Sequence, residues 1–168
     1  MWPETTLKRV RLLLAFFTAA LVVSGLTAIP LVLETRLLAS WFGEGSGLGS
    51  LWPGLGHWVS LVHQGLEQTQ KAYPFLAYGT DWLAFGHLIL ALMFLGAIKD
   101  PVRNRWVIDA GMIACVLIVP WALFFGAIRG IPFFWRLIDM SFGVFGLAPL
   151  WLARRDIMRM QDRSIASN

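Results

Sequence analysis

Residues 80–104 read TDWLAFGHLILALMFLGAIKDPVRN and decide the class of this protein. An acid and a tryptophan stand near the beginning, apolar residues fill the centre, and lysine, aspartate and arginine stand near the end. A helix needs roughly 20 such residues to cross about 30 Å of hydrocarbon, and residues 81–98 approach that length. His87 is the one ionisable side chain inside this apolar centre, where such groups are costly and often functional. The stretch predicts a transmembrane helix with a candidate functional histidine.

The composition of the whole chain is that of an integral membrane protein. Of its 168 residues, 57% are hydrophobic and only 14% are charged, with a mean hydropathy of +0.65. Soluble domains have roughly a quarter of their residues charged. The net charge of +4 comes from basic residues that gather at the ends of apolar segments, so no nucleic-acid partner is expected. Cys115 is the only cysteine, which excludes an intramolecular disulfide and predicts a small buried residue.

Three further apolar segments, residues 12–33, 106–128 and 137–153, are each predicted to cross the membrane. The basic head and small residues of the first segment also resemble a secretory signal peptide, but its apolar run exceeds the usual length of roughly 7–15 residues. The predicted fold class is an all-α integral membrane protein, an antiparallel four-transmembrane-helix bundle. It forms one membrane domain over residues 1–168, with a basic tail at 154–168 that includes Arg163.

The long connection at residues 34–79 is predicted to contain an external amphipathic helix. A glycine-rich run at 43–49 predicts a flexible turn, and residues 55–73 follow with helical periodicity. Apolar residues fall on one face of that helix and polar residues on the other: Leu55, Trp58, Val59, Val62 and Leu66 against His57, Gln64, Glu67, Gln68 and Lys71. The pattern predicts a helix that lies on the membrane surface.

The distribution of basic residues predicts the orientation. Ten of the fourteen Lys and Arg residues lie in the head, the 99–105 turn and the tail, whereas four lie in residues 34–79 and 129–136. Because cytoplasmic segments carry the excess of Lys and Arg, the positive-inside rule predicts that both termini are cytoplasmic. The expected location is a bacterial inner membrane or another plasma membrane, with lipids as direct partners.

Five residues near the outer ends of the spans form the candidate ligand-binding site: Asp81, His87, Arg129, Arg136 and Asp139. Asp81 begins the second span, and His87 lies about 9 Å further along the same helix. Arg136 and Asp139 have the i, i+3 spacing of a helical pair. We predict a polar pocket open to the outer side with His87 at its floor. The alternative is structural: the charges fix helix register, and His87 bonds a neighbouring carbonyl.

These features predict a non-enzymatic membrane protein, either an accessory subunit or a binder of a lipid or small ligand. A partner membrane subunit or a second copy of the chain is then expected. The alternatives centre on His87, as acid or base in a membrane enzyme, as axial ligand of a b-type haem, or with Asp139 in a proton-coupled carrier. No catalytic residues are assigned. No metal site is predicted, because His57, His63 and His87 lack metal-ligand spacing.

Overall fold

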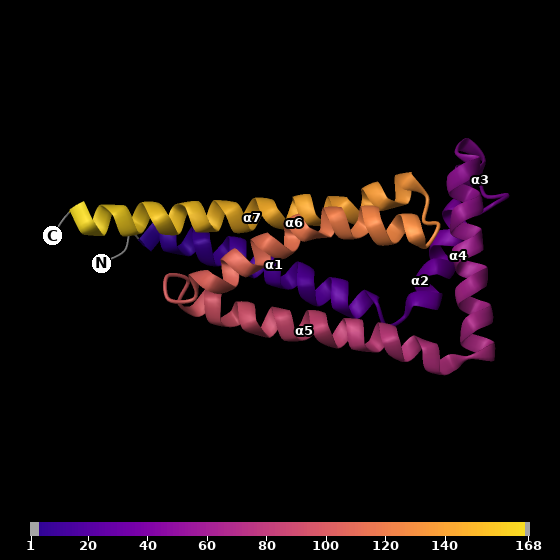
Figure 1. Cartoon of the computed structure of the whole chain (residues 1–168), viewed down its shortest axis with the longest axis horizontal. Coiled ribbons are helices and arrows are strands. Elements are labelled where there is room, and N and C mark those ends of the chain that lie inside the picture. Colours follow the sequence, from indigo (N-terminus) through magenta and orange to yellow (C-terminus); the bar gives the residue numbers. More distant parts are fainter. Residues whose placement is uncertain (1–3, 167–168) are drawn as a thin grey trace. The chain divides into compact units, whose positions relative to one another are not determined.

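The computed structural model describes the backbone of residues 4–166 and the side chains of residues 4–162, and within that part it contains helices and no strand (Figure 1). The start of the basic head, residues 1–3, and the side chain of Arg163 lie outside the described part. The elements in chain order are α1 (Glu4–Thr27), α2 (Leu31–Phe42), α3 (Gly47–Leu51), α4 (Pro53–Ala72), the 3-10 helix η1 (Pro74–Ala77), α5 (Tyr78–Lys99), α6 (Arg105–Ile128) and α7 (Phe133–Ala166).

Four helical segments are long and apolar enough to cross a membrane: Glu4–Thr27, Pro74–Lys99, Arg105–Ile128 and Phe133–Asp162. These segments contain most of the four predicted spans. This is the composition of a helical membrane protein.

The boundaries of the first and last spans differ from the sequence prediction. Helix α1 ends at Thr27, whereas the apolar run continues to residue 33. The chain breaks before Pro30, because proline disfavours helical geometry in the residue that precedes it. Helix α7 continues from the expected fourth span through residues 154–166, which were predicted as a separate tail. Arginine, methionine and glutamine are good helix formers, so polarity alone does not end this helix.

The chain divides into two compact units, Met1–Leu21 with Leu90–Asn168, and Val22–Ile89. Helices α1 and α5 each contribute residues to both units. We refer to Met1–Leu21 with Leu90–Asn168 as the terminal unit and to Val22–Ile89 as the central unit.

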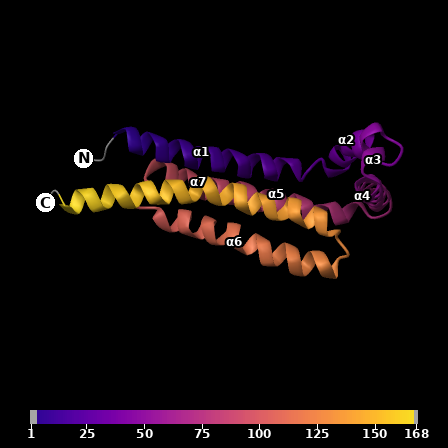
Figure 2. The ribbon, with the colours of Figure 1, turned by 90° about the horizontal axis from the view of Figure 1, so that it is seen from above.

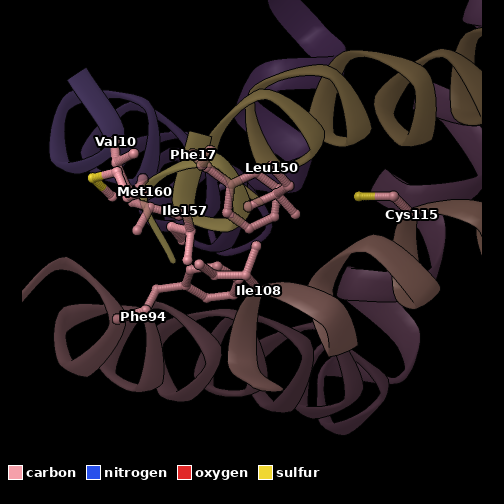
Figure 3. Close-up of a cluster of buried hydrophobic side chains, with 11 residues drawn as sticks. Val10, Phe17, Phe94, Ile108, Cys115, Leu150, Ile157 and Met160 are labelled. Atoms are coloured by element: carbon pink, nitrogen blue, oxygen red, sulfur yellow. The ribbon is translucent and has the colours of Figure 1, made fainter. Parts of the chain in front are cut away.

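In the terminal unit, α6 and α7 lie side by side as a helix hairpin in both ribbon views (Figures 1 and 2). Buried apolar side chains from four helices form its core: Val10, Leu14, Phe17, Phe94, Ala97, Ile108, Cys115, Leu150, Ala153, Ile157 and Met160. Figure 3 shows most of them in one group, with Cys115 apart from the others. A Cβ on Gly143 would overlap the carbonyl oxygen of Cys115, so glycine lets the two hairpin helices approach closely.

Polar side chains also tie the helices of the terminal unit together. The guanidinium of Arg11 donates to the carbonyls of Ile98 and Lys99 at 3.1 and 3.0 Å, which satisfies the C-terminal end of α5. Arg154 on α7 forms an ion pair with Asp109 on α6. Because lipid tails are as apolar as the helices themselves, such polar contacts help to hold membrane helices together.

In the central unit, α2 packs against α4, the helix that corresponds to the predicted surface helix at 55–73 (Figure 1). Helix α2 was not predicted. The glycine-rich run between them is a tight connection, in which the Gly49 amide donates to the Ser46 hydroxyl at 2.9 Å and caps α3. A Cβ on Gly49 would overlap the carbonyl of Gly43, so glycine is required for this close approach.

Candidate functional site

A groove of about 580 Å³ lies between α6 and α7 in the terminal unit. Its lining combines apolar side chains of α6 with Arg129 from the following turn and Asp139 from α7: Ala114, Leu117, Ile118, Trp121, Ala122, Phe125, Gly126, Arg129, Ile131 and Asp139. Ligand pockets commonly enclose about 300–1,000 Å³ and place a few polar groups among apolar ones. The groove between α6 and α7 has both properties.

The local sequence explains the shape of this groove. Ala122 is small and leaves space, whereas the rings of Trp121 and Phe125, with centroids 4.4 Å apart, form an aromatic wall. Pro120 lies inside α6 among these residues. It has no backbone amide to donate to the preceding turn, which weakens helical bonding at the depth of the groove.

Arg136, one of the predicted ligand residues, closes the turn between α6 and α7. Its Nε donates to the carbonyl of Ile131 at 2.8 Å, and its guanidinium lies 5.8 Å from the centre of the Phe133 ring. The side chain passes so close to Gly126 that a Cβ there would overlap it. Arg136 therefore satisfies the carbonyl of Ile131, which lies in the connection between α6 and α7.

Arg129 and Asp139, unlike Arg136, both line the groove. Arg129 is exposed and Asp139 is half-buried. Among the described side chains, neither has an ion-pair or hydrogen-bond partner, and no ion pair joins Asp139 to Arg136 as the i, i+3 spacing suggested. The pair does not form because the Arg136 guanidinium is occupied by carbonyl groups. The carboxylate of Asp139 and the guanidinium of Arg129 are therefore available to a ligand in the groove.

Asp81 and His87, the other two predicted site residues, belong to the central unit. Asp81 is exposed in the first turn of α5, where the positive end of the helix dipole favours a carboxylate. The Nδ1 atom of His87 lies 2.8 Å from the carbonyl of Leu83. A carbonyl only accepts, so Nδ1 carries the proton, and Nε2 has no partner among the described residues.

His87 also lies close to Gly25 of α1. A Cβ on Gly25 would lie 2.9 Å from the Cβ of His87 and 3.1 Å from the carbonyl of Ala84. Small residues allow such approach between helices in membranes. Because Asp81 and His87 belong to one unit and Arg129, Arg136 and Asp139 to the other, the five-residue pocket remains a prediction.

Asp156, a buried charge on α7, was not singled out by the sequence. Its side chain is 5% exposed and lies in ion pairs with Arg9, at 3.5 Å, and Arg155, at 3.7 Å. The sequence does contain a pattern that could have indicated its burial, because Ala153, Asp156 and Met160 recur at helical spacing on the buried face of α7. The sequence prediction ended the fourth span at residue 153, so it did not follow this pattern beyond that residue.

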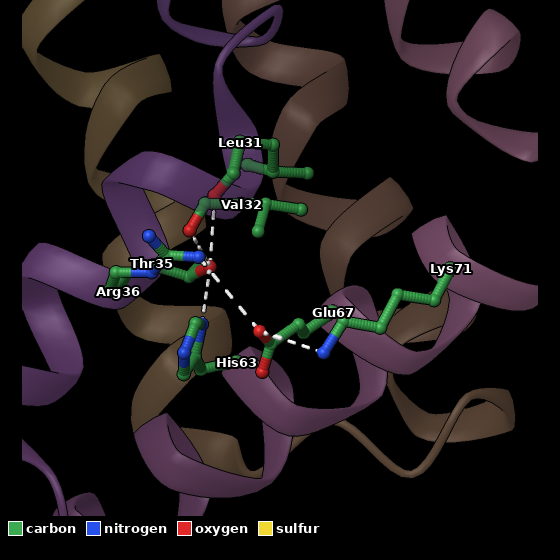
Figure 4. A network of polar contacts seen from close by, with 7 residues as sticks. All are labelled: Leu31, Val32, Thr35, Arg36, His63, Glu67 and Lys71. Atoms are coloured by element: carbon green, nitrogen blue, oxygen red, sulfur yellow. Dashed lines mark hydrogen bonds and ion pairs between the residues drawn. The ribbon is translucent and has the colours of Figure 1, made fainter. Parts of the chain in front are cut away.

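The other two histidines belong to polar contacts of the central unit, and Figure 4 shows those of His63. His63 Nδ1 lies 3.3 Å from the hydroxyl of Thr35, which joins α4 to α2. His57 pairs with Glu44 at 2.8 Å, on the exposed surface. Within residues 4–162, no three His, Cys, Asp or Glu side chains are grouped as ligands for a metal ion.

Glu67 lies on the same face of α4 as His63. Lys71 donates a hydrogen bond to it at 3.2 Å, and Arg36 on α2 lies 3.9 Å away. The hydrogen bond and the charge of Lys71 lower the pKa of Glu67 below its usual value, with smaller contributions from His63 and Arg36. This cluster stabilises the contact between α2 and α4.

Comparisons of the chain with protein-family models, with curated proteins and with solved structures find no match. Its function is therefore inferred from the geometry of these sites.

Proposed function

We propose that this protein is a four-span membrane protein whose termini are cytoplasmic and whose helices α2–α4 lie outside. The supporting observations are the four apolar helical segments and the ten-to-four division of Lys and Arg between the two sets of connecting segments. In this arrangement the spans pack as an antiparallel bundle, and α4 is an amphipathic surface helix. The membrane is a bacterial inner membrane or another plasma membrane.

Within this topology, we propose that the groove between α6 and α7 binds a lipid or a similar amphiphile from the outer leaflet. The observation that carries the proposal is the position of Arg129 and Asp139, two charged side chains without described partners, at a groove lined by apolar residues. The apolar chain of the ligand lies against Leu117, Trp121 and Phe125. Its anionic headgroup pairs with Arg129, and a hydroxyl or ammonium group of the headgroup donates to Asp139.

The headgroup supplies most of the selectivity in this proposal. Lipid tails are as apolar as leucine, so moving a chain from bilayer to groove gains little hydrophobic free energy. An arginine near the surface contributes roughly 1 kcal/mol to the attraction of an anionic headgroup. Binding is therefore selective rather than very tight, which suits reversible exchange with the membrane.

Native mass spectrometry of the protein, gently extracted from its own membrane, tests this function. The wild type is expected to retain a non-protein mass. Arg129→Gln should lower retention about fivefold, as loss of roughly 1 kcal/mol implies. Ala122→Phe, which fills the groove, should lower it further.

Two matched variants control for charge and bulk. Arg103→Gln removes an exposed arginine from the 99–105 turn, and Ala127→Phe adds a ring at an exposed position of α6 that does not line the groove. Both should retain the ligand as the wild type does. A wild-type protein that emerges without any bound mass, or equal losses in test and control variants, would exclude the groove as a ligand site.

A further inference from the structure

A second cavity, of about 350 Å³, lies in the terminal unit where the first turns of α1 meet the last described turns of α7. It is lined by Thr5, Thr6, Arg9, Asp156, Arg159 and Met160. At 1.5 Å per residue, Asp156 lies roughly 25 Å along α7 from Asp139, close to the thickness of the hydrocarbon core. The cavity is therefore separate from the groove between α6 and α7 and belongs to the opposite end of the same helix.

The carboxylate of Asp156 is an incompletely satisfied group in this cavity. Its side chain is 95% buried, yet Oδ2 forms no hydrogen bond within the described residues, and the Nε of Arg155 is buried and equally unsatisfied. Both ion-pair distances, 3.5 and 3.7 Å, exceed hydrogen-bond lengths. Burying charge with so few hydrogen bonds is a poor means of stabilising a fold, which points to another role for the cluster.

The balance of charge in the cluster is positive. Asp156 faces the guanidinium groups of Arg9 and Arg155, and Arg159 has no ion-pair or hydrogen-bond partner among the described residues. Arg9 is half-exposed and makes no hydrogen bond in the described structure. The hydroxyls of Thr5 and Thr6 also lack hydrogen-bond partners there.

The guanidinium of Arg159 and the hydroxyls of Thr5 and Thr6, which stand in the first turn of α1, are groups that bind phosphate. Arginine recognises phosphate oxygens through pairs of N–H donors, and the positive end of a helix favours an anion. Asp156 holds Arg9 beside the cavity and is a positioning residue rather than a ligand. The cavity has roughly ten times the volume that one water molecule takes up in the liquid, about 30 Å³, so a phosphate group fits.

We propose that this cavity binds a phosphate group, carried by a phospholipid headgroup or present as free phosphate. Arg9 and Arg159 pair with the phosphate oxygens, and the hydroxyls of Thr5 and Thr6 donate to them. The site does not depend on the proposed function of the groove, since the two share no lining residue.

The experiment uses the full-length protein in detergent after its lipid has been washed away. Inorganic phosphate is titrated into it in a calorimeter, and lipid retention is measured by native mass spectrometry after exposure to phosphatidylglycerol or to phosphate-free diacylglycerol. We expect binding of inorganic phosphate, or retention of phosphatidylglycerol over diacylglycerol. The first result identifies free phosphate as a ligand and the second a lipid headgroup.

Arg159→Gln is the test variant and Arg103→Gln the control, because both remove one exposed arginine and only Arg159 lines the cavity. Loss of a charged hydrogen-bond donor should weaken the binding about tenfold in Arg159→Gln and less than about twofold in the control. Unfolding curves of both variants should match that of the wild type. Equal weakening in the two variants, or no preference of the wild type for either phosphate probe, would overturn the proposal.

Discussion

Two of the three aspartates of helix α7, Asp139 and Asp156, have sharply different surroundings. Asp156 is buried and paired with two arginines, whereas Asp139 is half-buried beside the groove between α6 and α7 and has no partner in the described structure. Both carboxylates have an arginine three residues away, Arg159 and Arg136 respectively. Arg136 satisfies backbone carbonyls instead, and Asp156 draws its partners from α1 and from the adjacent position. Spacing along a helix therefore does not decide which charges pair.

The difference also separates two roles for a charge in a membrane protein. A buried, paired charge contributes to folding because removing one partner leaves the other uncompensated. An unpaired charge at a groove contributes little to folding and remains available to a ligand. This contrast makes the two aspartates suitable for direct comparison.

The largest expected effect is the loss of stability on replacing Asp156. Asp156→Ala leaves Arg9 and Arg155 without their carboxylate, and because both arginine side chains are partly exposed, we expect the lower part of the range for broken buried pairs, about 3 kcal/mol. Asp139→Ala should change the free energy of unfolding by less than about 0.5 kcal/mol. Denaturant unfolding in detergent measures both, and similar losses would abolish the contrast.

A change between α6 and α7 should affect the groove but leave the Asp156 pair intact. Gly143→Leu places a side chain against the carbonyl of Cys115, and we expect overpacking to cost about 2 kcal/mol and to reduce ligand retention. Gly86→Leu is the matched control, because a side chain at that position meets open space. Equal stability of the two variants would show that α6 and α7 can separate without loss.

A smaller difference is expected between Arg129, which lines the groove, and Arg136, which lies in the first turn of α7 and does not line it. Arg136→Met removes the hydrogen bond to Ile131, so stability should fall by about 1 kcal/mol. Arg129→Met should leave stability almost unchanged while lowering ligand retention. Unfolding and native mass spectrometry on the same samples separate the effects; greater destabilisation by Arg129→Met would reverse the assignment of roles.

The smallest effect concerns Glu67, an ion-paired carboxylate outside the spans. Its pKa in the folded protein lies below the usual 4.5, because Lys71 stabilises the ionised form. The stabilisation is therefore complete above pH 4.5 and is lost as the pH falls through the lowered pKa. In that acidic range the wild type should lose a small part of its stability, whereas Glu67→Gln, which has no carboxylate to protonate, should not. At neutral pH the variant should differ little from the wild type. Parallel acid-unfolding curves for wild type and variant would contradict this.

Much of the fold could be predicted from hydropathy, because a membrane span requires a continuous apolar run. The second and third spans correspond closely to α5 and α6. Helix α2 was missed because its apolar residues directly follow those of the first span, and Pro30 marks the only break between them. Of the candidate site, Arg129 and Asp139 do line one groove, whereas Arg136 has a structural role.

The sequence by itself determined that the chain has four segments able to cross a membrane. It also determined that most basic residues lie in the head, the 99–105 turn and the tail. These are properties of composition along the chain, and hydrocarbon selects for them directly. Only the tertiary structure decided which charged groups have partners. Helical periodicity decides toward which side of α7 Asp139 and Asp156 each point. Whether a charged partner lies there depends on the neighbouring helix or turn, and its distance depends on how closely the backbones pack. Glycines such as Gly143 set that distance, and no local pattern specifies which neighbour they will meet.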